Sequence, residues 1–211
     1  MPPDNTPLTL DRILVTAEDV IRRFGPEKAT VVDVARALGV SHAAVYRHVA
    51  SKAELRELVV SRWVETTMAP LREIVALSGP APQRLRRLVD TLIAIKRRRA
   101  TEDPEVFAAY RTLAAETQSV VEAHVDEMIT LTATIIRAGV EEGSIRSGDP
   151  VATARAVLLA TSKFHHPVHA AEWTDPNIDN AFEAVWELVI GGLSVPNSAA
   201  RSGNTARKRS R

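Results

Sequence analysis

The chain has 211 residues, of which 45% are hydrophobic and 25% charged, and it contains no cysteine. A chain of this size and composition can bury a hydrophobic core, which excludes disorder over most of its length. The lack of cysteine excludes disulfide scaffolds, cysteine nucleophiles and thiolate metal sites. No apolar run approaches the about 20 residues that span a bilayer, and the N-terminus lacks a secretory signal. We therefore expect a cytoplasmic protein without a membrane partner.

The net charge of +1 hides an uneven distribution of charge along the chain. Residues 1–65 are balanced, whereas residues 66–99 carry eight basic and two acidic side chains. Residues 100–199 carry five basic and fifteen acidic ones, and the last twelve residues carry five basic and none acidic. The near-neutral total therefore does not by itself exclude a nucleic-acid partner.

Apolar residues recur at three- and four-residue spacing, which predicts an all-α protein of about nine helices and no strand. Glycine and proline mark most of the helix ends, and Ser51 to Glu54 reads as a capping box. Pro70 is expected to break or kink the fourth helix, because its ring nitrogen cannot donate a backbone hydrogen bond. In chain order, the predicted helices cover residues 10–24, 31–38, 41–49, 51–77, a segment after 82, 103–142 with one break near 114–118, 151–164 and 175–192.

The segment from Thr30 to Lys52 has the sequence form of a helix-turn-helix. Ala35 is small enough for the second helix to cross closely, and Gly39 supplies the backbone freedom that the turn needs. The apolar side chains expected to fix the crossing angle are Val31, Val34, Leu38, Val40, Val45 and Val49. Once these are buried, the 41–48 helix presents small and hydrogen-bonding side chains, which suit a major groove about 12 Å wide.

This segment resembles the DNA-binding region of TetR-family transcriptional regulators. The residues that carry the resemblance are Ala35, Gly39-Val40-Ser41, Tyr46-Arg47-His48 and Ser51-Lys52. The resemblance is specific over residues 10–62 and architectural beyond them. It implies a helix-turn-helix domain over 1–50, preceded by a flexible arm at about 1–8, and an effector-binding and dimerisation domain over 51–193. Composition predicts that 194–211 form a disordered basic tail.

The resemblance also implies a double-stranded DNA operator, palindromic in form, as the partner. The residues expected to hold phosphates are Thr30, Tyr46, His48 and Lys52. Those expected at base edges or the adjoining backbone are Ser41, His42, Ala43, Ala44 and Arg47. Small apolar side chains favour contact with a thymine methyl group. The alternative, two short helices merely packed in a bundle, does not account for the run that ends at Lys52.

A homodimer is expected because specific binding normally needs two copies of this motif about 34–36 Å apart. The last two predicted helices suit an interface, since one is rich in alanine and valine and the other is apolar on more than one face. The candidate interface residues are Val157, Ala160, Phe182, Val185, Trp186 and Val189. The alternative is that these helices close a monomeric core.

The resemblance implies a mostly apolar cavity in the second domain that binds a small-molecule effector. The candidate lining residues are Phe107, Tyr110, Arg111, Met128, Phe164, His165, His169 and Trp173. Arg111 stands out because a buried arginine needs an anionic partner. His165, His166 and His169 form a cluster that suits either a metal with Glu172 or Asp175, or a helix C-terminus whose dipole they complement. We predict no metal site and no cofactor.

The basic run Lys96 to Arg99, together with Arg84, Arg86 and Arg87, is expected to form a solvated face. It has two alternative roles, as a surface close to DNA or as a binding site for an anionic effector. The basic tail at 207–211 also has two alternative interpretations. It either adds sequence-independent affinity for DNA or has no partner.

We therefore expect a repressor that occupies an operator and is released by its effector. The sequence has no glycine-rich phosphate loop, nucleophile–base pair or two-helix carboxylate motif, so it does not predict an enzyme. Two alternatives stay open. One is a helical small-molecule-binding protein or enzyme without DNA binding, and the other is an effector-independent DNA binder or activator.

Overall fold

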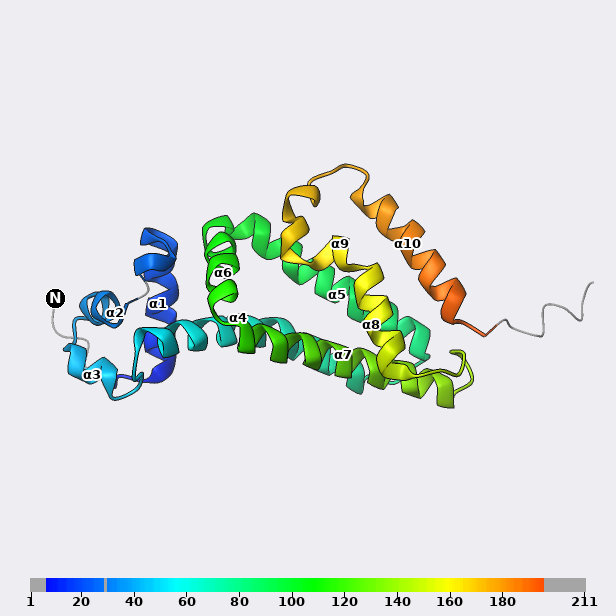
Figure 1. Cartoon of the computed structure of the whole chain (residues 1–211), viewed down its shortest axis with the longest axis horizontal. Helices are drawn as coiled ribbons and strands as arrows, with labels where there is room; N and C mark the ends of the chain where they lie inside the picture. Colours follow the sequence, from blue (N-terminus) through cyan, green and yellow to red (C-terminus); the bar gives the residue numbers. More distant parts are fainter. Residues whose placement is uncertain (1–6, 29, 196–211) are drawn as a thin grey trace, which may run out of the picture.

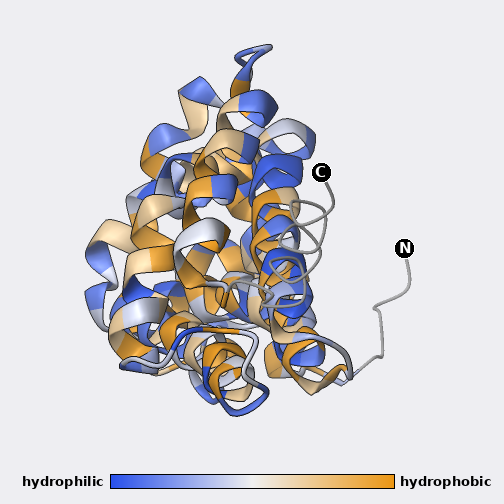
Figure 2. Ribbon diagram, turned by 90° about the vertical axis from the view of Figure 1, so that its right-hand side faces the viewer, coloured by the Kyte–Doolittle hydropathy of each residue, from blue (hydrophilic) through white to orange (hydrophobic). Residues whose placement is uncertain are grey.

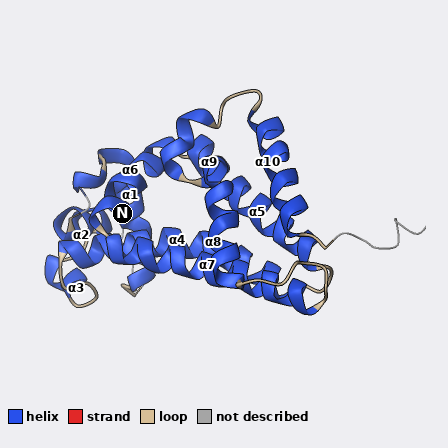
Figure 3. Cartoon of the chain, turned by 45° about the vertical axis from the view of Figure 1, so that its right-hand side comes forward, coloured by secondary structure: helices blue, strands red, loops and turns tan. Residues whose placement is uncertain are grey.

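The computed structural model describes residues 7–28 and 30–195. Within these ranges the chain is helical, with no strand apart from one isolated bridge between Ile145 and Ser194, which confirms the all-α class (Figure 3). The helices are α1 (Leu10–Phe24), η1 (Pro26–Lys28), α2 (Val31–Leu38), α3 (His42–Tyr46), α4 (Lys52–Ala76), α5 (Ala81–Glu102), α6 (Pro104–Glu116), α7 (Gln118–Glu141), α8 (Pro150–Ala160), α9 (Ser162–His165), η2 (Pro167–Glu172) and α10 (Ile178–Leu193). The predicted arm up to residue 6 and the predicted tail from residue 196 lie outside the described residues.

Two predicted helices have other bounds in the structure, and the break expected as one alternative at Pro70 is absent. The second helix of the helix-turn-helix ends at Tyr46 rather than Val49, because Arg47 and His48 form a turn. α4 runs unbroken through Pro70, where buried Met68 and Leu71 hold the helix against the core. The predicted 151–164 helix is divided at Thr161, whose hydroxyl donates to the Val157 carbonyl at 2.9 Å and competes with the helical backbone pattern.

Two hydrophobic clusters hold together the helices, whose arrangement Figure 1 shows. The first joins α1, α2, α3 and the N-terminal half of α4 at one end of the molecule, and it takes in Ala109 and Leu113 of α6. The second joins the rest of α4 to α5, α7, α8 and α10. Apolar and polar stretches alternate along the helices, as amphipathic helices packed on one side require (Figure 2). None of the described helices has the length and apolar character that a bilayer crossing requires.

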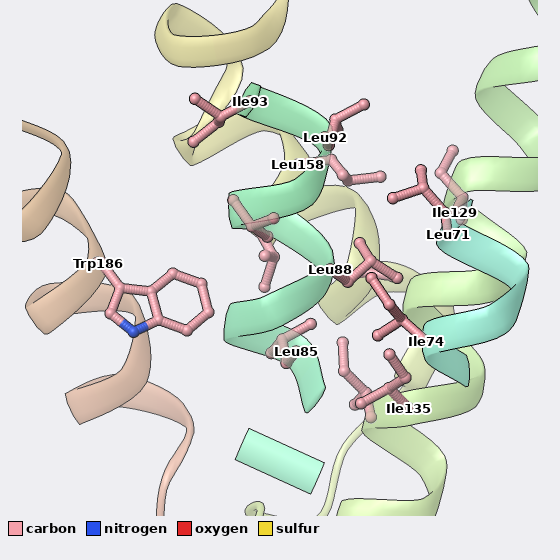
Figure 4. Packing of buried hydrophobic residues seen from close by; sticks show 14 of the residues in the cluster. Leu71, Ile74, Leu85, Leu88, Leu92, Ile93, Ile129, Ile135, Leu158 and Trp186 are labelled. Carbon is pink, nitrogen blue, oxygen red and sulfur yellow. The ribbon is translucent and has the colours of Figure 1, made fainter. Parts of the chain in front are cut away.

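α5 lies at the centre of the second cluster (Figure 4). Its buried Leu85, Leu88 and Leu92 face α4 and α7 on one side, and Trp186 of α10 points toward α5 from the other. Val157 of α8 is buried in the same cluster. Val157, Phe182 and Trp186, which sequence analysis placed in a dimer interface, are thus buried in the core of a single chain.

Candidate nucleic-acid interface and ligand cavity

The helix-turn-helix is built from α2, α3 and the turn at Gly39. Gly39 has φ = 69°, a left-handed conformation that favours glycine, and the Val40 N–H donates to the Ala35 carbonyl at 3.0 Å. The Ser41 side chain then caps α3 by accepting from the Ala44 N–H at 3.2 Å. Ala35 is fully buried, so the close crossing inferred from its size is present.

α3 and the turn after it lie at one end of the molecule (Figure 1), and their polar side chains are exposed. Tyr46 is 50% exposed, and Ala44 is the half-buried member of the group. The exposed members are Ser41, His42, Ala43, Tyr46, Arg47 and His48. Lys52 is also exposed and begins α4, where Ser51 accepts from the Glu54 N–H at 3.1 Å. The structure therefore leaves these predicted DNA contacts accessible, with Ala44 half-buried.

Thr30 differs from the other predicted DNA contacts. Its hydroxyl accepts from the Asp33 N–H at 3.1 Å and donates to the Asp33 carboxylate at 2.5 Å, while its own N–H donates to the Lys28 carbonyl at 2.7 Å. Both donors of Thr30 are therefore engaged within the protein. A phosphate contact from this hydroxyl would require Asp33 to give up its hydrogen bond.

A cavity of about 370 Å³ lies among α5, α6, α7 and the α9–η2 segment. Four of the predicted effector contacts line it: Tyr110, Arg111, Met128 and His165. Phe107 lines a second cavity of about 260 Å³ among α1, α4, α5 and α6, and Lys96 and Tyr110 line both cavities.

The other three predicted effector contacts lie elsewhere. Phe164 packs edge-on against Phe182 in the core, with ring centroids 5.1 Å apart. The Trp173 indole donates to the Lys163 carbonyl at 2.9 Å. His169 Nδ1 lies 2.7 Å from the Glu172 carboxylate.

Two buried polar residues that line the larger cavity were not predicted. Lys96 is only 6% exposed, and its ammonium lies 5.5 Å from the centre of the Tyr110 ring. His124 is 5% exposed. The spacing of Lys96 from Leu92 placed it on the apolar face of its helix and could have identified it. Arg111 lies at the exposed edge of the cavity, so the premise that it is buried is wrong.

Burial sets the charge state of the basic groups in this cavity. Desolvation, followed by the charge of Lys96, lowers the pKa of His124 to about 3 and that of His165 to about 4. Desolvation, followed by the charge of Arg99, lowers the pKa of Lys96 to about 8. At neutral pH both histidines are therefore uncharged, and Lys96 is the buried cation of the cavity.

Most of the basic run on α5 is not a solvated face, which corrects the sequence interpretation, while Arg87 and Arg98 are exposed as expected. Arg86 pairs with Asp90 and with Glu183 of α10, at 2.8 and 2.5 Å. Arg97 pairs with Asp179 of α10 at 2.6 Å. Arg99 donates to the Trp63 carbonyl at 2.9 Å. These arginines tie α5 to its neighbouring helices.

The histidine cluster does not converge on one point. His165 Nε2 lies 3.3 Å from the Thr161 hydroxyl inside the protein, whereas His169 meets Glu172 near the surface. Within the described residues, no three histidine, aspartate or glutamate side chains are arranged to hold a metal ion.

α6 connects the cavity to the helix-turn-helix end of the molecule. Ala109 and Leu113 on one side of α6 are buried in the first hydrophobic cluster, and Tyr110 on another side lines the cavity. The N-cap of α6, Asp103, accepts from Arg22 of α1 at 2.7 and 3.0 Å. At the other end of the helix, Glu116 pairs with Arg56 of α4. Both ends of α6 are thus fastened to the N-terminal helices.

Comparison with known proteins identifies a class of helix-turn-helix regulators. Residues 13–59 match the bacterial regulatory proteins of the tetR family, and residues 81–186 match the tetracyclin repressor-like C-terminal domain. The chain belongs to the TetR family, as the resemblance predicted, and is a DNA-binding transcriptional regulator rather than an enzyme. No curated protein matches the chain.

Solved structures share this fold. SmeT, the repressor of the Stenotrophomonas maltophilia multidrug efflux pump SmeDEF, is 18% identical with a TM-score of 0.64, covering 90% of this chain and 92% of its own. FadR from Bacillus subtilis in complex with stearoyl-CoA is 14% identical with a TM-score of 0.65, covering 87% and 99%. Reduced NemR from E. coli is 14% identical with a TM-score of 0.62, covering 88% and 97%. At these identities the likeness establishes the fold alone.

Proposed function

We propose that this regulator is a homodimeric repressor that binds a palindromic operator in the cytoplasm and is released by a small molecule bound in the larger cavity. The DNA contacts in this proposal come from α3, the turn after it and Lys52. The observation that carries the proposal is the position of α6, which contributes to the hydrophobic cluster of the helix-turn-helix and to the wall of the cavity.

A ligand that displaces α6 has a direct mechanical route to the DNA-binding helices. Tyr110 lines the cavity and packs edge-on against Trp63 of α4, with ring centroids 5.6 Å apart. The Arg22–Asp103 and Arg56–Glu116 pairs carry motion of α6 to α1 and α4. A ligand that prefers one arrangement of these helices shifts the spacing of the two recognition helices in the dimer.

The proposed dimer interface uses the outward faces of α8 and α10. Leu159 and Leu188 are 73% and 79% exposed, and exposed large apolar side chains on neighbouring helices favour association. Of the residues named from the sequence, Ala160 is exposed, and Val185 and Val189 are half-buried. We keep residues 1–50 and 51–193 as the proposed domains, although the first hydrophobic cluster reaches Trp63 of α4.

The cavity favours this proposal over an effector-independent DNA binder. Its volume of about 370 Å³ lies in the range of about 300–1,000 Å³ that is usual for small-molecule sites. The proposal predicts that bound effector and bound operator weaken one another reciprocally.

The DNA-binding part is tested by selecting genomic fragments with the purified protein and measuring affinity for the selected operator. We expect Tyr46→Ala with Arg47→Ala to weaken operator binding at least about 100-fold, because each removes a phosphate or base contact. Arg137→Ala, an exposed arginine of α7, is the matched control and should bind normally. Normal operator binding and transcription with the double variant would contradict the proposal.

A further inference from the structure

We propose that the ligand of the larger cavity is a monocarboxylate with an apolar body, whose carboxylate pairs with Lys96. This inference rests on the proposed function only in assigning the cavity to an effector. It follows from the charge, the unpartnered polar atoms and the shape of the site.

The cavity gathers basic groups from three helices without a carboxylate. Lys96 of α5, His124 of α7 and His165 of α9 face it, and Arg111 of α6 stands at its edge. None of its lining residues is acidic. Buried charged groups in proteins are normally paired, so a buried lysine in such surroundings indicates that an anion belongs beside it.

Lys96 and His124 lack the polar partners that a purely structural role would provide, whereas His165 Nε2 lies 3.3 Å from the Thr161 hydroxyl. Within the described residues, Lys96 makes no hydrogen bond or ion pair, and its one polar interaction is with the face of the Tyr110 ring. His124 Nδ1 is buried and has no hydrogen-bond partner. A buried ammonium group left without an acceptor destabilises the protein, and a carboxylate in the cavity accepts from Lys96.

The remainder of the cavity wall selects an apolar body and a single negative charge. Apolar side chains from α6, α7 and η2 form most of it, among them Ala114, Val121, Met128 and Val168. The interior holds one buried cation, because His124 and His165 are uncharged at neutral pH. A monoanion matches this one buried charge, whereas a dianionic phosphate would also require Arg111, at the exposed edge of the cavity, as a second charged donor.

The test compares two matched pairs of probes with the full-length protein, without DNA, by titration calorimetry. The probes are octanoate with octanamide and phenylacetate with phenylacetamide, which differ in charge and hardly in shape. We expect a carboxylate to bind at least about ten-fold more tightly than its amide, which corresponds to about 1.4 kcal/mol. Lys96→Met should abolish this preference, while Lys163→Met, an exposed lysine of α9, should keep it. A thermal melt confirms that both variants are folded.

The inference is wrong if an amide binds as tightly as its acid, if Lys96→Met keeps the preference, or if no probe binds. Adding the carboxylate to the protein–operator complex then separates the two proposals. A preference that depends on Lys96, without release of the operator, supports the ligand assignment and contradicts repression by effector release. Operator release by amides and acids alike supports effector release and contradicts the ligand assignment.

Discussion

Gly139 of α7 marks the closest approach between α7, the start of α5 and the loop after α7. A Cβ atom at this position would lie 2.8 Å from the Ala81 Cβ and 2.7 Å from Cγ1 of Ile145, both of which are buried. The nearest atom, Ile145 Cδ1 at 2.5 Å, is the end of a side chain, but Ala81 Cβ is fixed to the backbone of α5, so α5 and α7 must shift to admit a methyl group.

Gly139→Ala should therefore destabilise the protein despite the better helix propensity of alanine. Overpacking costs about 1–3 kcal/mol and the propensity gain is at most about 1 kcal/mol, so we expect a net loss of about 1–2 kcal/mol. Urea unfolding measures it. Gly148→Ala is the control, because a Cβ there meets only the Thr153 hydroxyl at 4.0 Å. Equal stability of the two variants would contradict the packing described for α7.

His124 and His165 predict an acid-sensitive fold. Burial lowers the pKa of His124 to about 3 and that of His165 to about 4, below their ordinary value of 6.5, so the unfolded chain binds more protons than the folded one between these values. Stability is therefore full above pH 6.5 and falls as the pH is lowered. Each histidine contributes a slope of about 1.4 kcal/mol per pH unit.

His124→Gln should remove one of these contributions. As the pH falls from 7 to 5, we expect the unfolding free energy of the wild type to decrease by more than that of the variant. Urea unfolding at each pH measures both. His42→Gln removes an exposed ring and controls for general effects of charge. Parallel pH profiles for wild type and His124→Gln would show that His124 is not held neutral in the fold.

At the scale of helices, the ends that depend on capping residues and glycine conformation were predictable from the sequence. The ends that depend on packing against other helices were not. α2 begins and ends as predicted, because Thr30 caps it and Gly39 takes a left-handed conformation. The course of α4 through Pro70 depends on buried neighbours that a propensity argument cannot weigh. For the same reason, periodicity identified the apolar faces of α8 and α10 but could not assign them to the chain's own core or to a partner.

The outward faces of α8 and α10 carry the prediction for assembly. Leu188→Glu should weaken the dimer, because a two-fold interface buries Leu188 of both protomers and the substitution places a charge at each of these positions. With about 1.5–3 kcal/mol lost per leucine, the dissociation constant should rise at least about 100-fold. Sedimentation velocity across a concentration series measures the change. Phe24→Glu, on an exposed aromatic of α1, should leave the dimer intact, and dissociation of both variants or of neither would place the interface elsewhere.

At the scale of the molecule, the candidate ligand site was only partly predictable, because it combines residues distant in sequence. Helical spacing was enough to predict Tyr110 and Arg111 as lining residues. That Lys96, His124 and His165 line the same cavity depends on how α5, α7 and α9 pack. The same packing changes the meaning of the charge pattern. Arg86 and Arg97 of the basic run are paired with acidic groups, so the positive charge of residues 66–99 is largely offset within the protein.

The whole-molecule charge distribution predicts a shallow salt dependence of operator binding. Residues 1–65 carry nine basic and nine acidic side chains, and around α3 the exposed fixed cations are Arg36, Arg47 and Lys52. With about three phosphates neutralised per subunit, the slope of log K against log salt for the dimer should be about −5. Lys52→Ala should make this slope shallower by about two units, and Lys163→Ala should leave it unchanged. A slope of about −10 or steeper would instead mean that the α5 arginines or the basic residues beyond 200 also contact the DNA.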